Sequence, residues 1–405
     1  MAVVSNSSHI AIYCQDSLGL GHLRRNTLIG QRLLEATTVR DILLITDSPA
    51  GPFFQLPDEM DHLKLPSIRK VDAGVWQSTR LQIQTADMLA WRSALLQKAL
   101  LHYKPDLFLA DHMPAGAQGE LLPAIEALKQ ARPQCFIVLG LRDILGAKDV
   151  IVRSWEREGA YAAVRRYYDR VLIYGNPKIF DTCGTYCLPV VPYGLHYCGY
   201  VVNHGPVVQG TSEFRRTCHF SRERFVYVSA GGGADGDLLM RTYLRAIRLL
   251  GPRADFATLM AVGINAPKAV FRELEAMAQG LPVQLVSYAG DSLSAIAAAD
   301  LVVCMAGYNT LSEVLSLGKK SLVVPRSGPS AEQRMRASLF ASRGLIDMLS
   351  PEDLCPERLA ERLLADLERK EDPTRDEVMD MSGASRAADR ILELLEQSAY
   401  AKRTA

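Results

Sequence analysis

The feature that most constrains the fold is a local order that recurs along the chain: a short apolar run, a turn of small residues, and an amphipathic segment. It is clearest at Leu301–Cys304, where residues 305–307 form the turn, and it recurs at residues 10–14 and 225–229. Short, wholly apolar runs are typical of strands buried on both faces of a sheet. Strands that alternate with helices favour parallel pairing. We therefore predict an α/β fold with parallel sheets.

Length and composition indicate a globular protein of about two domains. The chain has 405 residues, of which 48% are hydrophobic and 22% charged, with a net charge of +1. So small a net charge gives no electrostatic attraction for nucleic acid, and we expect no nucleic-acid partner. Residues 205–224 are polar and aperiodic. We therefore place an amino-terminal domain at residues 1–205 and a carboxyl-terminal domain at residues 223–405.

Some segments carry more local expectations. Apolar periodicity predicts one helix at about residues 85–103 and another at about residues 149–168. Residues 52–80 contain several prolines, so we expect this range to be rich in loops. Two closing helices are predicted at about residues 357–370 and 385–397.

The expected compartment is the cytoplasm. No apolar run reaches the length of a membrane-spanning helix, and residues 1–9 lack the regions of a signal peptide. The eight cysteines are scattered, and Cys183 and Cys187 form a close pair without a second pair. Because structural zinc sites need more ligands than that, we expect no metal centre.

The first glycine turn places a histidine at the start of a helix. Gly19, Gly21, His22 and Arg24 follow the apolar run at residues 10–14. A helix N-terminus disfavours the imidazolium, so His22 would stay neutral and act as a base near pH 7. The two glycines and Arg24 would line a phosphate or acceptor site. The alternative is that His22 is a solvated loop residue or a cap.

A second group of polar residues follows the apolar run at residues 106–110. Asp111 and His112 stand at its carboxyl end, and ligands of open parallel sheets bind beyond these ends. We therefore expect Asp111 and His112 to face the same crevice as His22 and to include the second candidate base. The alternative is a strand-end aspartate that caps a helix.

The stretch after Leu301–Cys304 combines features of a nucleotide site. Gly307 breaks the pattern, and Asn309 and Thr310 are predicted to cap the following helix. Backbone N–H groups at such a helix start bind phosphate, and the carboxylate of Glu313 one turn later would accept hydrogen bonds from a ribose diol. The alternative is a capped surface helix with a dipole-favoured glutamate.

Three successive glycines, Gly231 to Gly233, follow the apolar run at residues 225–229. Their cost in chain entropy is offset where backbone must approach a ligand or a facing domain closely. Asp235 and Asp237 come next. They would either hold a metal ion on a diphosphate or lie as caps in the first turn of a helix, and we predict caps.

These motifs resemble the GT-B glycosyltransferases and, in the second half, the family of the N-acetylglucosaminyltransferase that forms lipid II. The resemblance rests on residues 229–233, 291–300, 305–313 and 332–333. It implies two Rossmann-like domains facing across a cleft, with the acceptor on the amino-terminal domain and the donor on the carboxyl-terminal domain. Glu313 would bind the ribose, Asn309 and Thr310 the diphosphate. The implied nucleotide and donor residues are Gly231, Gly232, Gly233, Ala289, Gly290, Gly307, Asn309, Thr310, Glu313 and Gln333.

The chain departs from that family at two places. Glu332 stands where the family has a second glutamine, and residues 199–203 contain no arginine where the family uses one on the diphosphate. Residues 19–25 are instead similar to the nucleotide-sugar hydrolase of pseudaminic acid synthesis, in which a histidine of this motif is the proposed base that activates water.

The resemblance implies an inverting, metal-independent glycosyltransferase that uses a nucleotide-diphospho-sugar, expected to be UDP-linked. The acceptor is unknown and is either a small molecule or lipid-linked, and no cofactor is expected. Two alternatives stay open. One is a hydrolase or epimerase of the same substrate, because fold does not fix function. The other is a sugar-nucleotide-binding module without catalysis.

Overall fold

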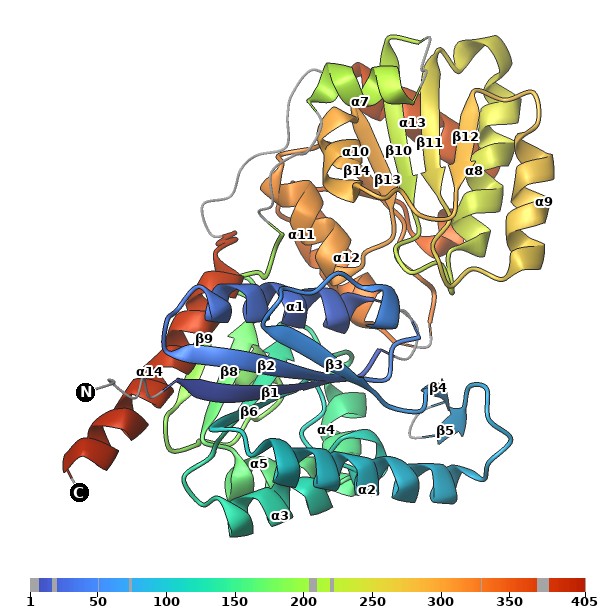
Figure 1. Ribbon diagram of the computed structural model, residues 1–405. Coiled ribbons are helices and arrows are strands. Elements are labelled where there is room, and N and C mark those ends of the chain that lie inside the picture. The colour runs from blue at the N-terminus through green and yellow to red at the C-terminus, as the bar shows by residue number, and fades with distance from the viewer. Residues whose placement is uncertain are drawn as a thin grey trace. The chain divides into compact units, whose positions relative to one another are not determined.

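The computed structural model describes residues 7–16, 20–49, 51–72, 75–203, 210–218, 222–328, 330–369 and 379–404. The chain divides into two compact units. The first comprises Met1–Val201 together with Asp380–Ala405, and the second is Val202–Met379. Both are α/β units with a parallel sheet, as predicted (Figure 1).

The first unit is built on a seven-stranded parallel sheet in the order β3-β2-β1-β6-β7-β8-β9. The strands are β1 Ser8–Cys14, β2 Val39–Thr46, β3 Met60–Lys64, β6 Leu107–Asp111, β7 Phe136–Arg142, β8 Arg170–Tyr174 and β9 Leu195–Tyr197. A separate antiparallel hairpin pairs β4 (Ile68–Asp72) with β5 (Val75–Ser78). β3 and this hairpin lie in residues 52–80, which were predicted to be rich in loops; short strands therefore separate the loops of that range.

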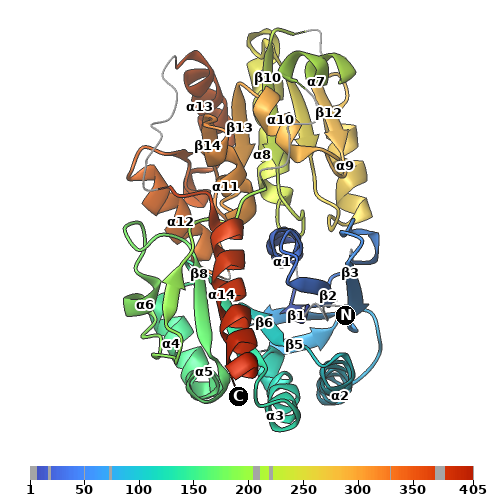
Figure 2. The ribbon, with the colours of Figure 1, turned by 60° about the vertical axis from the view of Figure 1, so that its left-hand side comes forward.

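Helices cover both faces of this sheet (Figures 1 and 2). They are α1 Gly21–Leu34, α2 Thr85–Tyr103, α3 Leu122–Ala131, α4 Lys148–Arg157, α5 Ala160–Tyr167, α6 Thr182–Thr185 and α14 Gly383–Thr404. The helix predicted at residues 85–103 is confirmed. The one predicted at 149–168 is two helices, because Gly159 between them adopts the left-handed conformation with φ +68° and ends the regular ladder.

The final helix returns to the first unit. α14 packs against α1 and the end of β8 (Figure 2), and Arg170, which is 5% exposed, pairs with Glu393 at 3.2 Å. The expected division, in which residues 223–405 form one domain, therefore differs from the observed grouping at residues 380–405. Packing between elements some 200 residues apart leaves no local sequence signal.

The second unit has a six-stranded parallel sheet in the order β12-β11-β10-β13-β14-β15. The strands are β10 Arg224–Ser229, β11 Phe256–Ala261, β12 Val283–Val286, β13 Leu301–Cys304, β14 Ser321–Val323 and β15 Asp347–Met348. The helices are α7 Thr211–Thr217, α8 Asp237–Leu250, α9 Lys268–Ala278, α10 Ser292–Ala298, α11 Tyr308–Ser316, α12 Glu332–Ala341 and α13 Pro356–Glu368. β11 and β13 are buried along their whole length, which explains their continuous apolar sequence.

In both sheets the strand order reverses next to a strand that is followed by one of the glycine turns, β1 in the first sheet and β10 in the second. In the first, the chain leaves β1 toward β2 on one side, and β6 lies on the other side. In the second, β10 lies in the same way between β11 and β13. Ligands of open α/β sheets bind beyond the carboxyl ends of the strands at such switch points. The turns after β1, β6, β10 and β13 are therefore the places to look for a site.

Candidate active site

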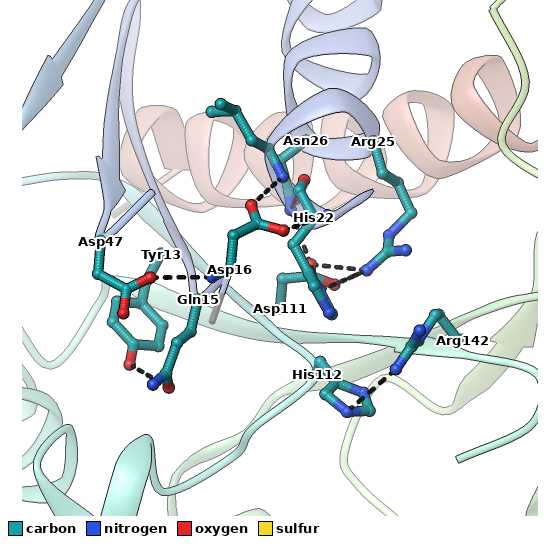
Figure 3. A network of polar contacts seen from close by, with 11 residues as sticks. Tyr13, Gln15, Asp16, His22, Arg25, Asn26, Asp47, Asp111, His112 and Arg142 are labelled. Atoms are coloured by element: carbon teal, nitrogen blue, oxygen red, sulfur yellow. Dashed lines mark hydrogen bonds and ion pairs between the residues drawn. The ribbon is translucent and has the colours of Figure 1, made fainter. Parts of the chain in front are cut away.

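The side chain of Asp16, two residues after the end of β1, lies at the N-terminus of α1. Its carboxylate accepts hydrogen bonds from the backbone N–H groups of His22 at 3.0 Å and Leu23 at 2.6 Å (Figure 3). The Asp16 N–H in turn donates to Asp47 Oδ1 at 2.9 Å. Asp16 was missed by sequence reasoning, although an aspartate between a strand and a helix start is a recognisable capping signal. Burial raises the pKa of Asp16 to about 7, even though the two N–H donors oppose this shift.

A buried aspartate at the end of β6 orients His22, which is the second residue of α1 as predicted. Asp111 is fully buried, and its Oδ2 lies 2.7 Å from His22 Nδ1 (Figure 3). Arg25 Nη2 donates to both carboxylate oxygens at 2.9 and 2.7 Å, and Asn26 Nδ2 donates at 2.8 Å. Burial alone would raise the pKa of Asp111, but Arg25 and His22 hold it well below its ordinary value. Asp111 is therefore an ionised acceptor of several hydrogen bonds.

The charge of Asp111 decides which nitrogen of His22 carries the proton. An ionised carboxylate only accepts, so His22 Nδ1 is the protonated nitrogen and donates to it. Arg25 Nη2, 2.8 Å from Nδ1, is then a second donor to the same carboxylate. His22 Nε2 keeps its lone pair, and no residue of the described chain hydrogen-bonds to it. Burial lowers the pKa of His22 against the pull of Asp111, so the neutral ring is a base.

His112 lies beside this pair without replacing it. Its ring centroid is 5.1 Å from that of His22, and its Nε2 is 3.4 Å from Arg142 Nη2 (Figure 3). His112 adopts φ +72°, which is uncommon outside glycine and is found at functional sites. Burial and the nearby Arg142 lower the pKa of His112 well below its ordinary value. The structure therefore brings His22, Asp111 and His112 together, as predicted from the strand ends.

The predicted phosphate or acceptor site in the first glycine turn is only partly described. Gly19 lies outside the described residues. Gly21 is the first residue of α1, and Arg24 follows one turn later. Because the Asp16 carboxylate occupies the N–H groups of His22 and Leu23, two of the donors expected for a phosphate are already used.

A second buried network fixes Asp47, the acceptor for Asp16. Arg92 is fully buried on α2 and donates to Glu120 through Nε at 2.6 Å and Nη2 at 2.7 Å. Its Nη1 lies 3.6 Å from Asp47. Tyr13 also donates to Glu120, at 2.8 Å. The position of α1 is thus tied through Asp16 and Asp47 to a buried arginine on α2.

In the second unit, the residues predicted as caps of α11 do not cap it. The helix begins at Tyr308, and its N-cap is Gly307, which has no side chain. Asn309 and Thr310 are the second and third residues of the helix, two and three positions after the N-cap, so the capping prediction was wrong. Glu313 lies one turn in and is 3% exposed.

In the glycine turn after β10, one glycine packs closely against the backbone of a neighbouring segment. A Cβ on Gly233, whose φ is +87°, would lie 2.4 Å from Val262 O and 2.7 Å from Gly263 Cα. At Gly231, with φ +63°, the nearest atom to such a Cβ is Thr310 Oγ1, 4.0 Å away. Gly232 lies between them. Gly233 is thus required for packing, and Gly231 faces the start of α11.

The remaining predicted donor residues surround α10 and α12. Ala289 and Gly290, with φ +61° at Gly290, precede Asp291, which caps α10 by accepting from Ser294 N at 2.9 Å. Gln333 stands in the first turn of α12, where its Oε1 accepts from Arg326 N at 3.1 Å. Glu332, in place of a glutamine, is 5% exposed and pairs with the buried Arg336 at 2.9 Å.

Asp235 and Asp237 are ion-paired rather than capping. Asp235 Oδ2 lies 3.0 Å from Arg326 Nη1, and Asp237 Oδ1 lies 2.6 Å from Arg241 Nε. Gly236 occupies the N-cap position of α8, so the prediction of two capping aspartates was wrong. Among the described residues, no group of three or more His, Cys, Asp or Glu side chains is arranged to hold a metal ion.

Much of the second half is similar to a known family of domains. Residues 227–393 match the Glycosyltransferase family 28 C-terminal domain. A UDP-N-acetylglucosamine–N-acetylmuramyl-(pentapeptide) pyrophosphoryl-undecaprenol N-acetylglucosamine transferase of Burkholderia cenocepacia is 32% identical over 136 residues, which is 33% of this chain and 37% of that protein. The chain therefore aligns with little more than a third of that relative's length. An uncharacterized glycosyltransferase of Methanopyrus kandleri is 27% identical over 71% of this chain and 82% of its own length.

Solved structures match along nearly the whole chain. The glycotransferase of kitacinnamycin superposes with a TM-score of 0.63 at 17% identity, covering 96% of this chain and 99% of that one. A putative UDP-N-acetylglucosamine 2-epimerase from Listeria monocytogenes gives a TM-score of 0.64 at 13% identity, with 96% of each chain covered. At such low identity these matches concern the fold, and they confirm the GT-B prediction. The similarity of residues 19–25 to a nucleotide-sugar hydrolase stays a prediction. Residues 227–393 thus match the model of the glycosyltransferase family 28 C-terminal domain, within a chain of GT-B fold.

Proposed function

We propose that the protein is an inverting glycosyltransferase in which the second unit binds a nucleotide-diphospho-sugar and His22 of the first unit is the general base. The observation that carries the proposal is the orientation of His22: its Nδ1 is fixed on the ionised Asp111 at 2.7 Å. This leaves the basic Nε2 for substrate. Asp111 itself is buried beneath its donors, so in this proposal it positions the histidine rather than taking the proton.

The chemistry follows from that orientation. His22 Nε2 removes the proton of an acceptor hydroxyl, whose oxygen attacks the anomeric carbon of the donor sugar as the bond to the diphosphate breaks. The resulting imidazolium is stabilised by Asp111. Attack from the face opposite the leaving group inverts the anomeric configuration. Release of the imidazolium proton to solvent restores the base.

The leaving diphosphate is stabilised in the second unit without a metal ion. The start of α11 and the turn after β10 present backbone N–H groups and the positive end of a helix dipole. Glu313, one turn into α11, accepts the ribose hydroxyls, and Gln333 contacts the donor sugar. UDP is the proposed nucleotide, since the Burkholderia relative is named for a UDP-linked sugar.

The proposed acceptor class comes from a relative, and the proposed compartment comes from the cysteines. The same relative acts on an undecaprenol-linked acceptor, so a lipid-linked acceptor is one of the two acceptor classes to test. No helix in the described ranges is long and apolar enough to cross a membrane. All eight cysteines are free thiols, which supports a reducing compartment such as the cytoplasm.

The test is release of free nucleotide from a panel of nucleotide-sugars, with and without candidate acceptors, after a thermal-shift screen has selected those that bind. The proposal expects release that depends on the acceptor and is lost in His22→Ala. Binding without any release from any sugar would identify a non-catalytic module and overturn the proposed activity.

One alternative has an observation in its favour. The protein has the same fold as a putative UDP-N-acetylglucosamine 2-epimerase, and His22 would activate water as readily as a sugar hydroxyl. In that case free nucleotide, or an epimerised sugar, would form without an acceptor. Product analysis by NMR in the absence of acceptor separates these reactions from transfer.

A further inference from the structure

Arg326 crosses the carboxyl edge of the second sheet. It lies after β14, and its Nη1 contacts Asp235 Oδ2 at 3.0 Å in the turn after β10. β14 and β10 are not neighbours, because β13 lies between them. The Arg326 side chain therefore crosses the carboxyl end of β13, from which residues 305–307 lead into α11.

The turn that contains Asp235 lies close to the segment that leads into α11. A Cβ on Gly236, next to Asp235, would lie 3.9 Å from Met305 Sδ. One on Gly231 would lie 4.0 Å from Thr310 Oγ1. Gly231 and Gly236, on either side of Asp235 in the turn from β10 to α8, thus lie close to the segment that begins α11, and Arg326 reaches this turn through Asp235.

Arg326 is held in place by its backbone and by one carboxylate. Its N–H donates to Gln333 Oε1 at 3.1 Å. The Nε is buried and has no hydrogen-bond partner among the described residues. The side chain of Arg326 is 20% exposed and that of Asp235 is 36% exposed. Because Asp235 is the more exposed partner, its carboxylate can return to solvent at small cost when another anion takes its place.

We infer that Arg326 binds the diphosphate of the donor and that Asp235 occupies its guanidinium in the absence of that ligand. Arginine presents paired N–H donors that match phosphate oxygens, and it is always charged. A diphosphate beside the buried Glu313 needs a positive group besides the α11 dipole, whose end carries only about half a charge. This inference rests on the proposed function, since it assigns a further residue to the same donor site.

The test compares UDP with uridine in the full-length protein. Arg326→Gln should weaken UDP binding by about ten- to a hundredfold, the effect of losing charge-assisted hydrogen bonds. Binding of uridine, measured by ligand-observed NMR, should change less than twofold, because uridine has no phosphate. Arg241→Gln is the matched control: it breaks the neighbouring pair with Asp237 and should leave both affinities unchanged.

A second variant keeps the test valid if Arg326→Gln does not fold. Asp235→Asn removes the competing carboxylate and retains the arginine, so it should bind UDP more tightly than wild type and uridine equally. The inference is overturned if wild type binds UDP and Arg326→Gln binds it equally well, or if uridine and UDP weaken together. Failure of the wild type to bind UDP would overturn the proposed donor site and this inference with it.

Discussion

The starts of α1 and α11 have the same local sequence order but different partners. Each follows a buried strand and a glycine turn at the switch point of a parallel sheet. At α1 the carboxylate of Asp16 takes the N–H groups of His22 and Leu23. At α11 the N-cap is Gly307, which brings no side chain. The same order of strand, glycine turn and helix thus leaves the backbone N–H groups of the first turn occupied by a side chain at α1 but not by the N-cap residue at α11.

We propose separate roles for the two helices. With its N-terminus filled by the Asp16 carboxyl group, α1 holds a neutral histidine whose proton position is set by Asp111. With a glycine cap, α11 can accept the phosphate of a ligand. The following predictions test this division, beginning with the largest expected effect.

Removing the base should cost the most. His22→Ala should lower turnover by about 10²–10⁴-fold, whereas nucleotide affinity, set in the second unit, should stay nearly constant. Steady-state kinetics and calorimetry on the same preparation measure both. Because the pKa of His22 is lowered, wild-type activity should persist to below about pH 6.5 and fall only in more acidic buffer. Near-normal turnover in His22→Ala would refute its role as the base.

Asp111→Asn should damage both stability and catalysis. It leaves the buried Arg25 guanidinium without its carboxylate, which typically costs about 3–5 kcal/mol of the free energy of unfolding. It also removes the acceptor that fixes the His22 proton on Nδ1. Urea unfolding gives the first effect, and turnover of the folded fraction gives the second. Full activity in a correctly folded variant would show that Asp111 does not orient the base.

Asp16→Asn tests the contact of the Asp16 carboxyl group with the first turn of α1, because this contact should make the free energy of unfolding depend on pH. The pKa of Asp16 in the folded protein, about 7, lies above the ordinary value of 3.8. The stability from its protonated form is therefore complete below pH 4 and is lost as pH rises through 7. Relative to Asp16→Asn, wild type should lose roughly 2–4 kcal/mol across this window. Unfolding at several pH values measures the difference, and Asp61→Asn, at a 94% exposed side chain, should show no such trend.

Glu313→Ala should weaken UDP binding at least about tenfold by removing charged hydrogen bonds to the ribose. Unlike Arg326→Gln, it should weaken uridine to the same extent, because both ligands contain the ribose. Calorimetry that showed unchanged binding of UDP would refute the ribose assignment.

The smallest expected effect is that of EDTA. Asp235 and Asp237 are paired with Arg326 and Arg241, so turnover should survive exhaustive chelation. Loss of activity that magnesium or manganese restores would place the two aspartates at a metal ion.

Local patterns predicted much of the fold and part of the candidate site. Buried strands such as β13 are readable because both of their faces are apolar, and Asp111 follows from its place at a strand end. The N-cap of α11 was misassigned because glycine and asparagine are both favoured N-cap residues, and the sequence does not decide whether Gly307 or Asn309 takes that position. The Arg326 contact and the return of α14 depend on packing between distant segments, which no local pattern encodes.

Hydrogen exchange in the presence and absence of UDP tests the division between the two helices most directly. Under this division, UDP should slow exchange of backbone amides at residues 230–236 and in α11 and leave those of the first turn of α1 unchanged. Protection of the first turn of α1, with no change in α11, would contradict it.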